Sequence, residues 1–87
     1  MNRNQIWQSI ELELRKAKRQ HPNWPDHIAA QAGIVNNRSG KLMDLALQMK
    51  YNKDKSKKTK DHFRNRIEAE AIKVAVTAIR FLENLKS

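Results

Sequence analysis

Apolar residues in this sequence recur every three or four positions, in three segments separated by a proline-containing connector and by a run of lysines. In the first segment Ile6, Ile10 and Leu14 follow one another at intervals of four. This spacing places the side chains on one face of an α-helix. No alternation of apolar and polar residues persists for five positions, as a half-buried strand would require. The pattern therefore predicts an all-α fold.

The first helix is expected over residues 3–20, because Pro22 disfavours helical backbone at the residue before it. The second is expected to begin at Asp26, whose carboxylate can accept hydrogen bonds from the first N–H groups of a helix, and to end near Tyr51. The expected apolar stripe of this second helix consists of Ile28, Ala32, Val35, Leu42, Ala46 and Met49.

Two glycines, Gly33 and Gly40, fall inside the second predicted helix. Each costs about 1 kcal/mol relative to alanine in a helix interior. Their presence indicates either a close approach of another helix to this one or a break in the helix, and we favour the close approach.

Residues 52–60 contain five lysines and no apolar residue, which predicts a basic loop. Thr59 or Asp61 is suited to cap the helix that follows, expected over about 61–86. Its main apolar stripe consists of Phe63, Ile67, Val74, Ala78, Phe81 and Leu85, and a second apolar face of Ala75, Ile79 and Leu82. Two apolar faces require neighbours on more than one side, or a second subunit.

These elements predict one domain over residues 1–87, in which an N-terminal helix packs with a long antiparallel helical pair. A chain of this length buries only about 60–65% of its unfolded surface, so its core has little margin. We therefore expect an oligomeric helical bundle, most simply a two-fold homodimer. Trp7 and Trp24 sit beside apolar residues and are expected to anchor the core or an interface.

Several classes of protein are excluded by composition. The chain has no cysteine, which rules out disulfides, thiolate zinc sites and a cysteine nucleophile. Its longest apolar runs are three residues, far short of a membrane span, and no secretory signal opens the sequence. The three histidines form no His-x-x-x-His pattern, and none is paired with an aspartate at the spacing typical of a zinc site. We expect a soluble, cytoplasmic protein without a membrane partner and without a metal or other cofactor.

The positive charge is concentrated in the middle third of the chain. The chain has a formal net charge of +9, and residues 36–66 carry ten basic and three acidic side chains. Such a concentration of charge attracts anionic partners. Arg38 and Lys41 lie three residues apart and so share a helix face. The basic face that we expect to bind anions comprises Arg38, Lys41, Lys50, Lys53, Lys55, Lys57, Lys58 and Lys60.

The segment from Trp24 to Val35, continued by Gly40, Leu42, residues 70–72 and residues 78–82, resembles MazG-like all-α nucleoside triphosphate pyrophosphohydrolases. The similarity is greatest to the short variety found in phages and mobile elements, and it covers about residues 22–85. It implies a helical dimer or tetramer in which acidic motifs on two helices hold Mg²⁺ against the phosphates of a nucleotide.

The sequence departs from the family pattern at the implied metal site. Asn37, Arg38 and Lys41 stand where the first motif has glutamates, and Lys73 stands at the aspartate position that follows Glu70. Cations beside a magnesium site oppose metal binding. The resemblance therefore implies a pyrophosphohydrolase fold without catalytic residues, in which Glu70 is free to pair with Arg38 or Lys41.

The sequence thus predicts an inactive MazG-like protein that acts as a binding module for an anionic partner: a nucleotide, a nucleic acid or an acidic protein. One alternative is an active Mg²⁺-dependent pyrophosphohydrolase that uses Asp44, Glu68 and Glu70. Another is a structural protein whose charge serves solubility alone.

Overall fold

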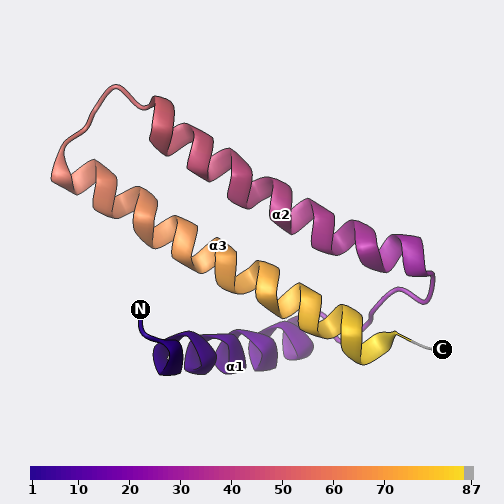
Figure 1. Cartoon of the computed structure of the whole chain (residues 1–87). Coiled ribbons are helices and arrows are strands. Elements are labelled where there is room, and N and C mark those ends of the chain that lie inside the picture. The colour runs from indigo at the N-terminus through magenta and orange to yellow at the C-terminus, as the bar shows by residue number, and fades with distance from the viewer. Residues whose placement is uncertain (86–87) are drawn as a thin grey trace.

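A computed structural model describes residues 1–85 and consists of three helices (Figure 1). They are α1 (Arg3–Gln20), α2 (Ile28–Tyr51) and α3 (Lys57–Asn84). α2 and α3 form a long antiparallel hairpin, and α1 packs against α3 but not against α2. The described residues contain no strand. The predicted all-α class, the antiparallel pair and the packing of the third helix on two sides are confirmed.

The bounds predicted for the first helix are confirmed at both ends. α1 starts with a capping box, in which the Asn2 side chain accepts from the Gln5 N–H at 2.9 Å and the Gln5 side chain accepts from the Asn2 N–H at 2.9 Å. It ends at Gln20, before the connector that contains Pro22. Lys18 then ties this end of α1 to α3, with its ammonium 3.1 Å from the Glu83 carboxylate.

The predicted start of the second helix is wrong by two residues. α2 begins at Ile28, and its cap is His27, whose Nδ1 accepts from the Ala29 N–H at 3.2 Å. The backbone carbonyl of Asp26, rather than its carboxylate, is used: it accepts from the Gln31 side-chain amide at 3.3 Å. The predicted end of the helix at Tyr51 is confirmed.

The face of α2 that meets α3 includes polar residues that interrupt the apolar pattern. Gln31 and Leu45 are buried and Arg38 is half-buried, whereas Ala32 and Ala46 of the predicted stripe are exposed. Gln31, Arg38 and Leu45 are spaced by seven residues, or two turns, as in the seam of a coiled coil. The predicted stripe is therefore only partly correct: Val35, Leu42 and Met49 are half-buried, whereas Ile28, Ala32 and Ala46 are exposed.

The same interface carries polar residues on α3. Arg38 pairs with Glu70, and counting two turns in opposite directions from this pair places Leu45 opposite Phe63. Both of these apolar side chains are buried. The hairpin is therefore held by an apolar layer near its closed end and by an ion pair near its middle.

The glycines do not mark a close helix approach within this chain, contrary to the prediction. α2 continues unbroken through Gly33 and Gly40, and a Cβ added at either position would meet no atom of residues 1–85 within 4 Å. Both glycines lie on an exposed part of the helix surface.

The third helix begins earlier than predicted, so the basic loop is shorter. Ser56 is the cap of α3, and its hydroxyl accepts from the Thr59 N–H at 3.3 Å. The connecting loop is therefore residues 52–56 rather than 52–60. Lysine has good helix propensity, so the lysine-rich segment extends the helix once Ser56 has capped it.

The core of the described chain is small. Its buried apolar residues are Ile10, Leu45, Phe63 and Val76. The radius of gyration is 14.9 Å, compared with about 12 Å expected for a compact domain of this length. Trp7 is 57% exposed, so it does not anchor the core of this chain. Among the described residues, no helix is both long enough and apolar enough to cross a membrane.

Candidate functional site

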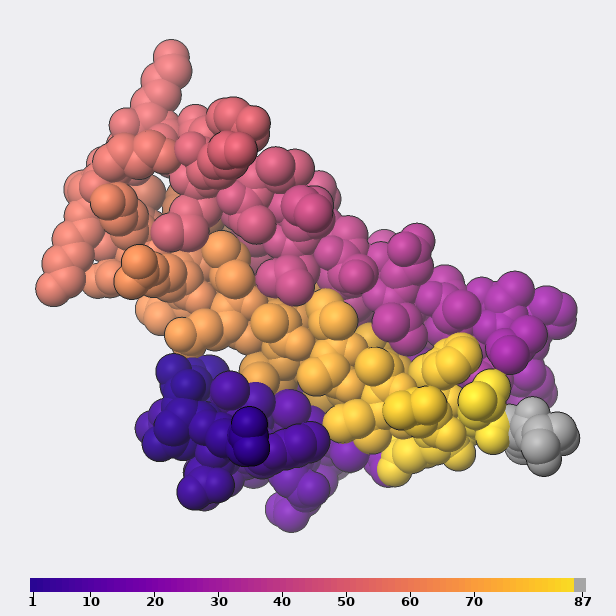
Figure 2. Space-filling view, viewed as in Figure 1, coloured from indigo at the N-terminus to yellow at the C-terminus, as the bar shows by residue number. Residues whose placement is uncertain are grey.

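The predicted basic face is divided between two places on the hairpin. Arg38 lies near the middle of α2, whereas six lysines gather where α2 and α3 are joined, at one extremity of the molecule (Figures 1 and 2). Arg38 is thirteen residues before the end of α2, or about 20 Å along the helix axis. Lys41 lies between the two places and is exposed. We call the joined end the lysine tip; it comprises Lys50, Lys53, Lys55, Lys57, Lys58 and Lys60.

The loop of the lysine tip is organised around one carboxylate. The Asp54 carboxylate accepts hydrogen bonds from the Thr59 hydroxyl at 2.7 Å and from the Ser56 N–H at 2.9 Å. The Asn52 side chain accepts in turn from the Asp54 N–H at 2.9 Å. The hydrogen bond from Thr59, followed by those from Ser56, holds the pKa of Asp54 below its usual value. Asp54, the only acidic residue between Lys50 and Lys60, is thus engaged by its own loop, and Asp61 follows directly after Lys60.

One lysine of the tip has a structural role. The Lys55 ammonium donates to the backbone carbonyls of Met49 at 3.1 Å and Lys50 at 2.9 Å, which lie in the last turn of α2. These carbonyls have no partner within the helix, and the negative end of the helix dipole favours a cation there. Lys55 therefore caps α2, and the other five lysines of the tip remain exposed.

The first turn of α3 carries lysines where a helix favours acidic residues. Lys57 and Lys58 are its first two residues, and the turn contains no acidic side chain. A helix N-terminus bears a partial positive charge, so each cation there is unfavourable by about 0.3–1 kcal/mol. The positive charges of Lys57 and Lys58 therefore add to that of the helix end, which the Asp54 carboxylate of the preceding loop offsets in part.

The sequence allowed Glu70 to pair with Arg38 or with Lys41, and the pair forms with Arg38. The Arg38 guanidinium nitrogen lies 3.2 Å from the Glu70 carboxylate, and the two side chains are 34% and 12% exposed, respectively. Lys41, the other possible partner, forms no ion pair with Glu70 among the described residues.

The residues at the implied metal position do not fit Mg²⁺. This ion prefers several oxygen ligands, whereas these positions supply the Asn37 amide, the cations of Arg38, Lys41 and Lys73, and one carboxylate that Arg38 already engages. Within residues 1–85, no group of three or more histidine, aspartate or glutamate side chains is arranged to hold a metal ion. Asp44 and Glu68, the other ligands of the alternative enzyme, are exposed.

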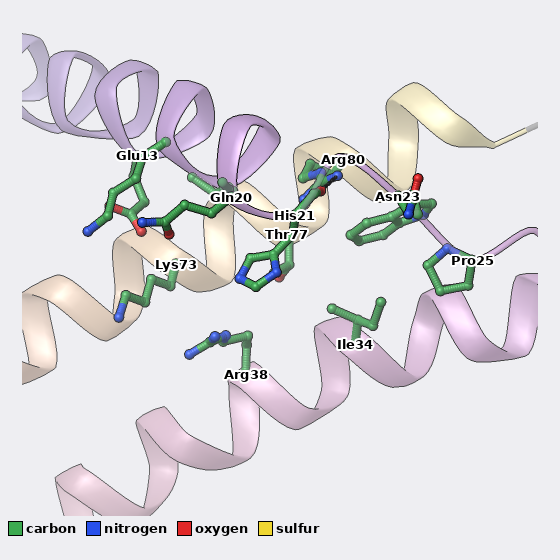
Figure 3. A pocket seen from close by; sticks show the side chains of 14 residues that line it. Glu13, Gln20, His21, Asn23, Pro25, Ile34, Arg38, Lys73, Thr77 and Arg80 are labelled. Carbon is green, nitrogen blue, oxygen red and sulfur yellow. Dashed lines mark hydrogen bonds between the residues drawn. The ribbon is translucent and has the colours of Figure 1, made fainter.

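A cavity that was not predicted lies where the three helices meet (Figure 3). It has a volume of about 430 Å³ and is lined by residues of α1, of the connector that follows, of α2 and of α3. We call it the three-helix cavity. Its cationic lining residues are Lys16, Arg38, Lys73 and Arg80. These four residues are spread over 65 positions of the sequence, so no local sequence motif could have predicted the cavity.

Comparisons with family models, with curated proteins and with solved structures find no match for this chain. Its function is therefore inferred from its own residues.

Proposed function

We propose that this protein is a binding module for an anionic polymer, namely nucleic acid, and that the lysine tip is its contact surface. The observation that carries the proposal is the group of five exposed lysines at one end of the hairpin, beside a helix whose first turn contains no acidic side chain. Phosphates spaced along a nucleic acid backbone attract such a group and release counterions on binding. An exposed tip reaches a polymer more readily than a residue within the hairpin does.

The placement of these lysines supports a role in binding rather than in folding. Lys57 and Lys58 oppose the dipole of α3, so they lower the stability of the free protein. A bound phosphate would neutralise both the lysines and the helix end. Residues that reduce stability while strengthening an interaction are typical of functional surfaces. Solubility alone would be served equally well by lysines elsewhere.

The order of the tip also supports binding. Hydrogen bonds of Asp54 and Lys55 fix the loop and the helix ends on both sides of it. The exposed lysines are consequently attached to a preorganised backbone, and binding orders fewer groups than it would on a disordered tail. Contacts of this kind recognise charge and spacing, so we expect little preference for base sequence.

We further propose that the chain has a MazG-like fold without hydrolase activity. The antiparallel hairpin is consistent with the resemblance, and the pairing of Arg38 with Glu70 supports the loss of metal binding. Wild-type protein supplied with Mg²⁺ or Mn²⁺ should release no pyrophosphate from nucleoside triphosphates. Release that is abolished by Glu70→Gln would establish the enzyme instead.

A second copy of the chain is the partner that we propose for the exposed face of α2. Met43, Leu47 and Tyr51 lie one turn apart on this face and are 59%, 44% and 71% exposed. The small core and the extended shape of the single chain favour such association. Sedimentation should detect a dimer that Leu47→Glu dissociates, whereas Leu12→Glu, at an exposed leucine of α1, should leave it intact.

The decisive comparison for the binding proposal is between two triple charge reversals. One changes the tip: Lys53→Glu, Lys57→Glu and Lys58→Glu. The matched control changes α1 by the same net charge: Arg3→Glu, Arg15→Glu and Arg19→Glu. Fluorescence anisotropy with labelled DNA and RNA should show binding that the tip variant loses and the control largely retains. Equal losses in the two variants would show that net charge, and not the tip, determines binding.

A further inference from the structure

The three-helix cavity has an excess of positive charge. Four cationic side chains line it, whereas Glu13 is the only acidic residue of the lining. Glu70 neutralises one of the cations, Arg38, at 3.2 Å. Two formal positive charges therefore remain without a counter-charge among these six residues. Figure 3 shows the side chains of His21, Arg38 and Lys73 extending into the space between the helices.

Arg80 is the most unusual of these cations because it is buried. It is 6% exposed, and its guanidinium donates to the His21 carbonyl at 2.7 Å and lies 4.8 Å from the centre of the Trp24 ring. No carboxylate pairs with it among residues 1–85. A carbonyl and an aromatic face compensate a buried charge only in part. An anion that entered the cavity would relieve the remaining penalty.

The Trp24 side chain offers a second unused group. Its indole N–H is buried and has no hydrogen-bond acceptor among the described residues. A buried donor without an acceptor is costly and is rare in proteins. The same ring lines the cavity and lies beneath Arg80. The guanidinium of Arg80 and the ring of Trp24 thus both belong to the lining of the cavity.

We propose that the three-helix cavity binds a small phosphate-bearing anion without a metal ion. A phosphate dianion matches the two uncompensated charges, and guanidinium groups such as that of Arg80 bind phosphate oxygens with favourable geometry. The cavity volume of about 430 Å³ lies within the range of small-molecule sites. Lys73 is half-buried and reaches the same cavity from α3, so it serves as a second cationic contact.

Calorimetric titration with inorganic phosphate and with glycerol phosphate tests the proposal, using chloride at the same ionic strength as the reference. Lys73→Gln should weaken binding at least about tenfold, as the loss of a charge-assisted hydrogen bond would. Arg66→Gln is the matched control, because Arg66 is an exposed cation of the same helix that does not line the cavity. Tighter binding of the ester would identify a phosphate monoester as the ligand, and weaker binding of the ester would identify free phosphate.

Tryptophan fluorescence locates the binding event. In a Trp7→Phe background Trp24 is the only tryptophan, and phosphate should change its emission as Arg80 moves relative to the ring. Charge reversal at the lysine tip should leave the affinity for phosphate within about twofold, because screening limits the effect of distant charges. Failure of this proposal is thus distinct from failure of nucleic acid binding. Absence of binding, an unchanged emission, or equal effects of Lys73→Gln and Arg66→Gln would overturn it.

Discussion

The guanidinium of Arg38 on α2 lies 3.2 Å from the carboxylate of Glu70 on α3, across the interface that holds the hairpin together. The pair occupies positions that are apolar in most helical interfaces. It joins positions of the two helices that lie opposite each other, and it engages the carboxylate that the resemblance implies as a metal ligand.

The pair should contribute a measurable coupling to stability. We expect Arg38→Leu and Glu70→Leu each to destabilise the protein and the double variant to lose less than the sum. The coupling should be about 1 kcal/mol, since Arg38 is 34% exposed and solvent screens the pair. Urea unfolding of the four proteins gives the cycle. Additive effects would show that the two side chains do not stabilise each other.

The lysines at the start of α3 should reduce stability. Replacing Lys57 and Lys58 by glutamate should raise the free energy of unfolding by about 0.3–1 kcal/mol each at low salt, because the helix dipole favours acidic residues there. Thermal melting measures the effect, and Arg66→Glu in the middle of the same helix is the control. A lower melting temperature for the tip variant would contradict this account of the helix end.

The contribution of Asp54 should depend on pH. Its pKa is lowered by hydrogen bonds from Thr59 and Ser56, so the ionised carboxylate stabilises the fold. This stabilisation is present above the usual aspartate pKa and disappears as the pH falls through the lowered value. The stability difference between wild type and Asp54→Asn should therefore be larger at neutral pH than under acidic conditions. A difference that is constant with pH would contradict the assignment.

The open space around Gly33 predicts a stabilising substitution. An added Cβ would meet no atom of the described residues within 4 Å, so Gly33→Ala should raise the free energy of unfolding by about 0.5–1 kcal/mol through helix propensity. Chemical unfolding at several protein concentrations tests this. Destabilisation that grows with concentration would place a second copy against this part of α2.

The helical segments could be predicted where the sequence signals are local. Pro22 limits α1, and the apolar spacing from Ile6 onward defines its length, so its bounds were correct. The start of α3 was missed because Ser56, rather than Thr59 or Asp61, caps it. Residues 57–60 contain no apolar residue and were therefore predicted as loop, although lysine has good helix propensity.

The interface and the cavity could not be predicted in the same way. Gln31 and Arg38 occupy the α2 seam, and a search for apolar periodicity passes over both. The lining of the three-helix cavity comes from three helices and a connector. Lys16 comes near Lys73 and Arg80 only because α1 packs on α3. The one signal in the sequence was Arg80 itself, an arginine within the apolar end of α3.

The salt dependence of nucleic acid binding tests the central claim most directly. Five exposed lysines that contact phosphates predict a slope of about −4.5 for the logarithm of the association constant against the logarithm of salt concentration on duplex DNA, and reversal of three should reduce it to about −2. The triple reversal on α1 should leave the slope unchanged. Binding that is insensitive to salt, or a slope that the tip reversal does not reduce, would contradict the assignment of the lysine tip as the contact surface.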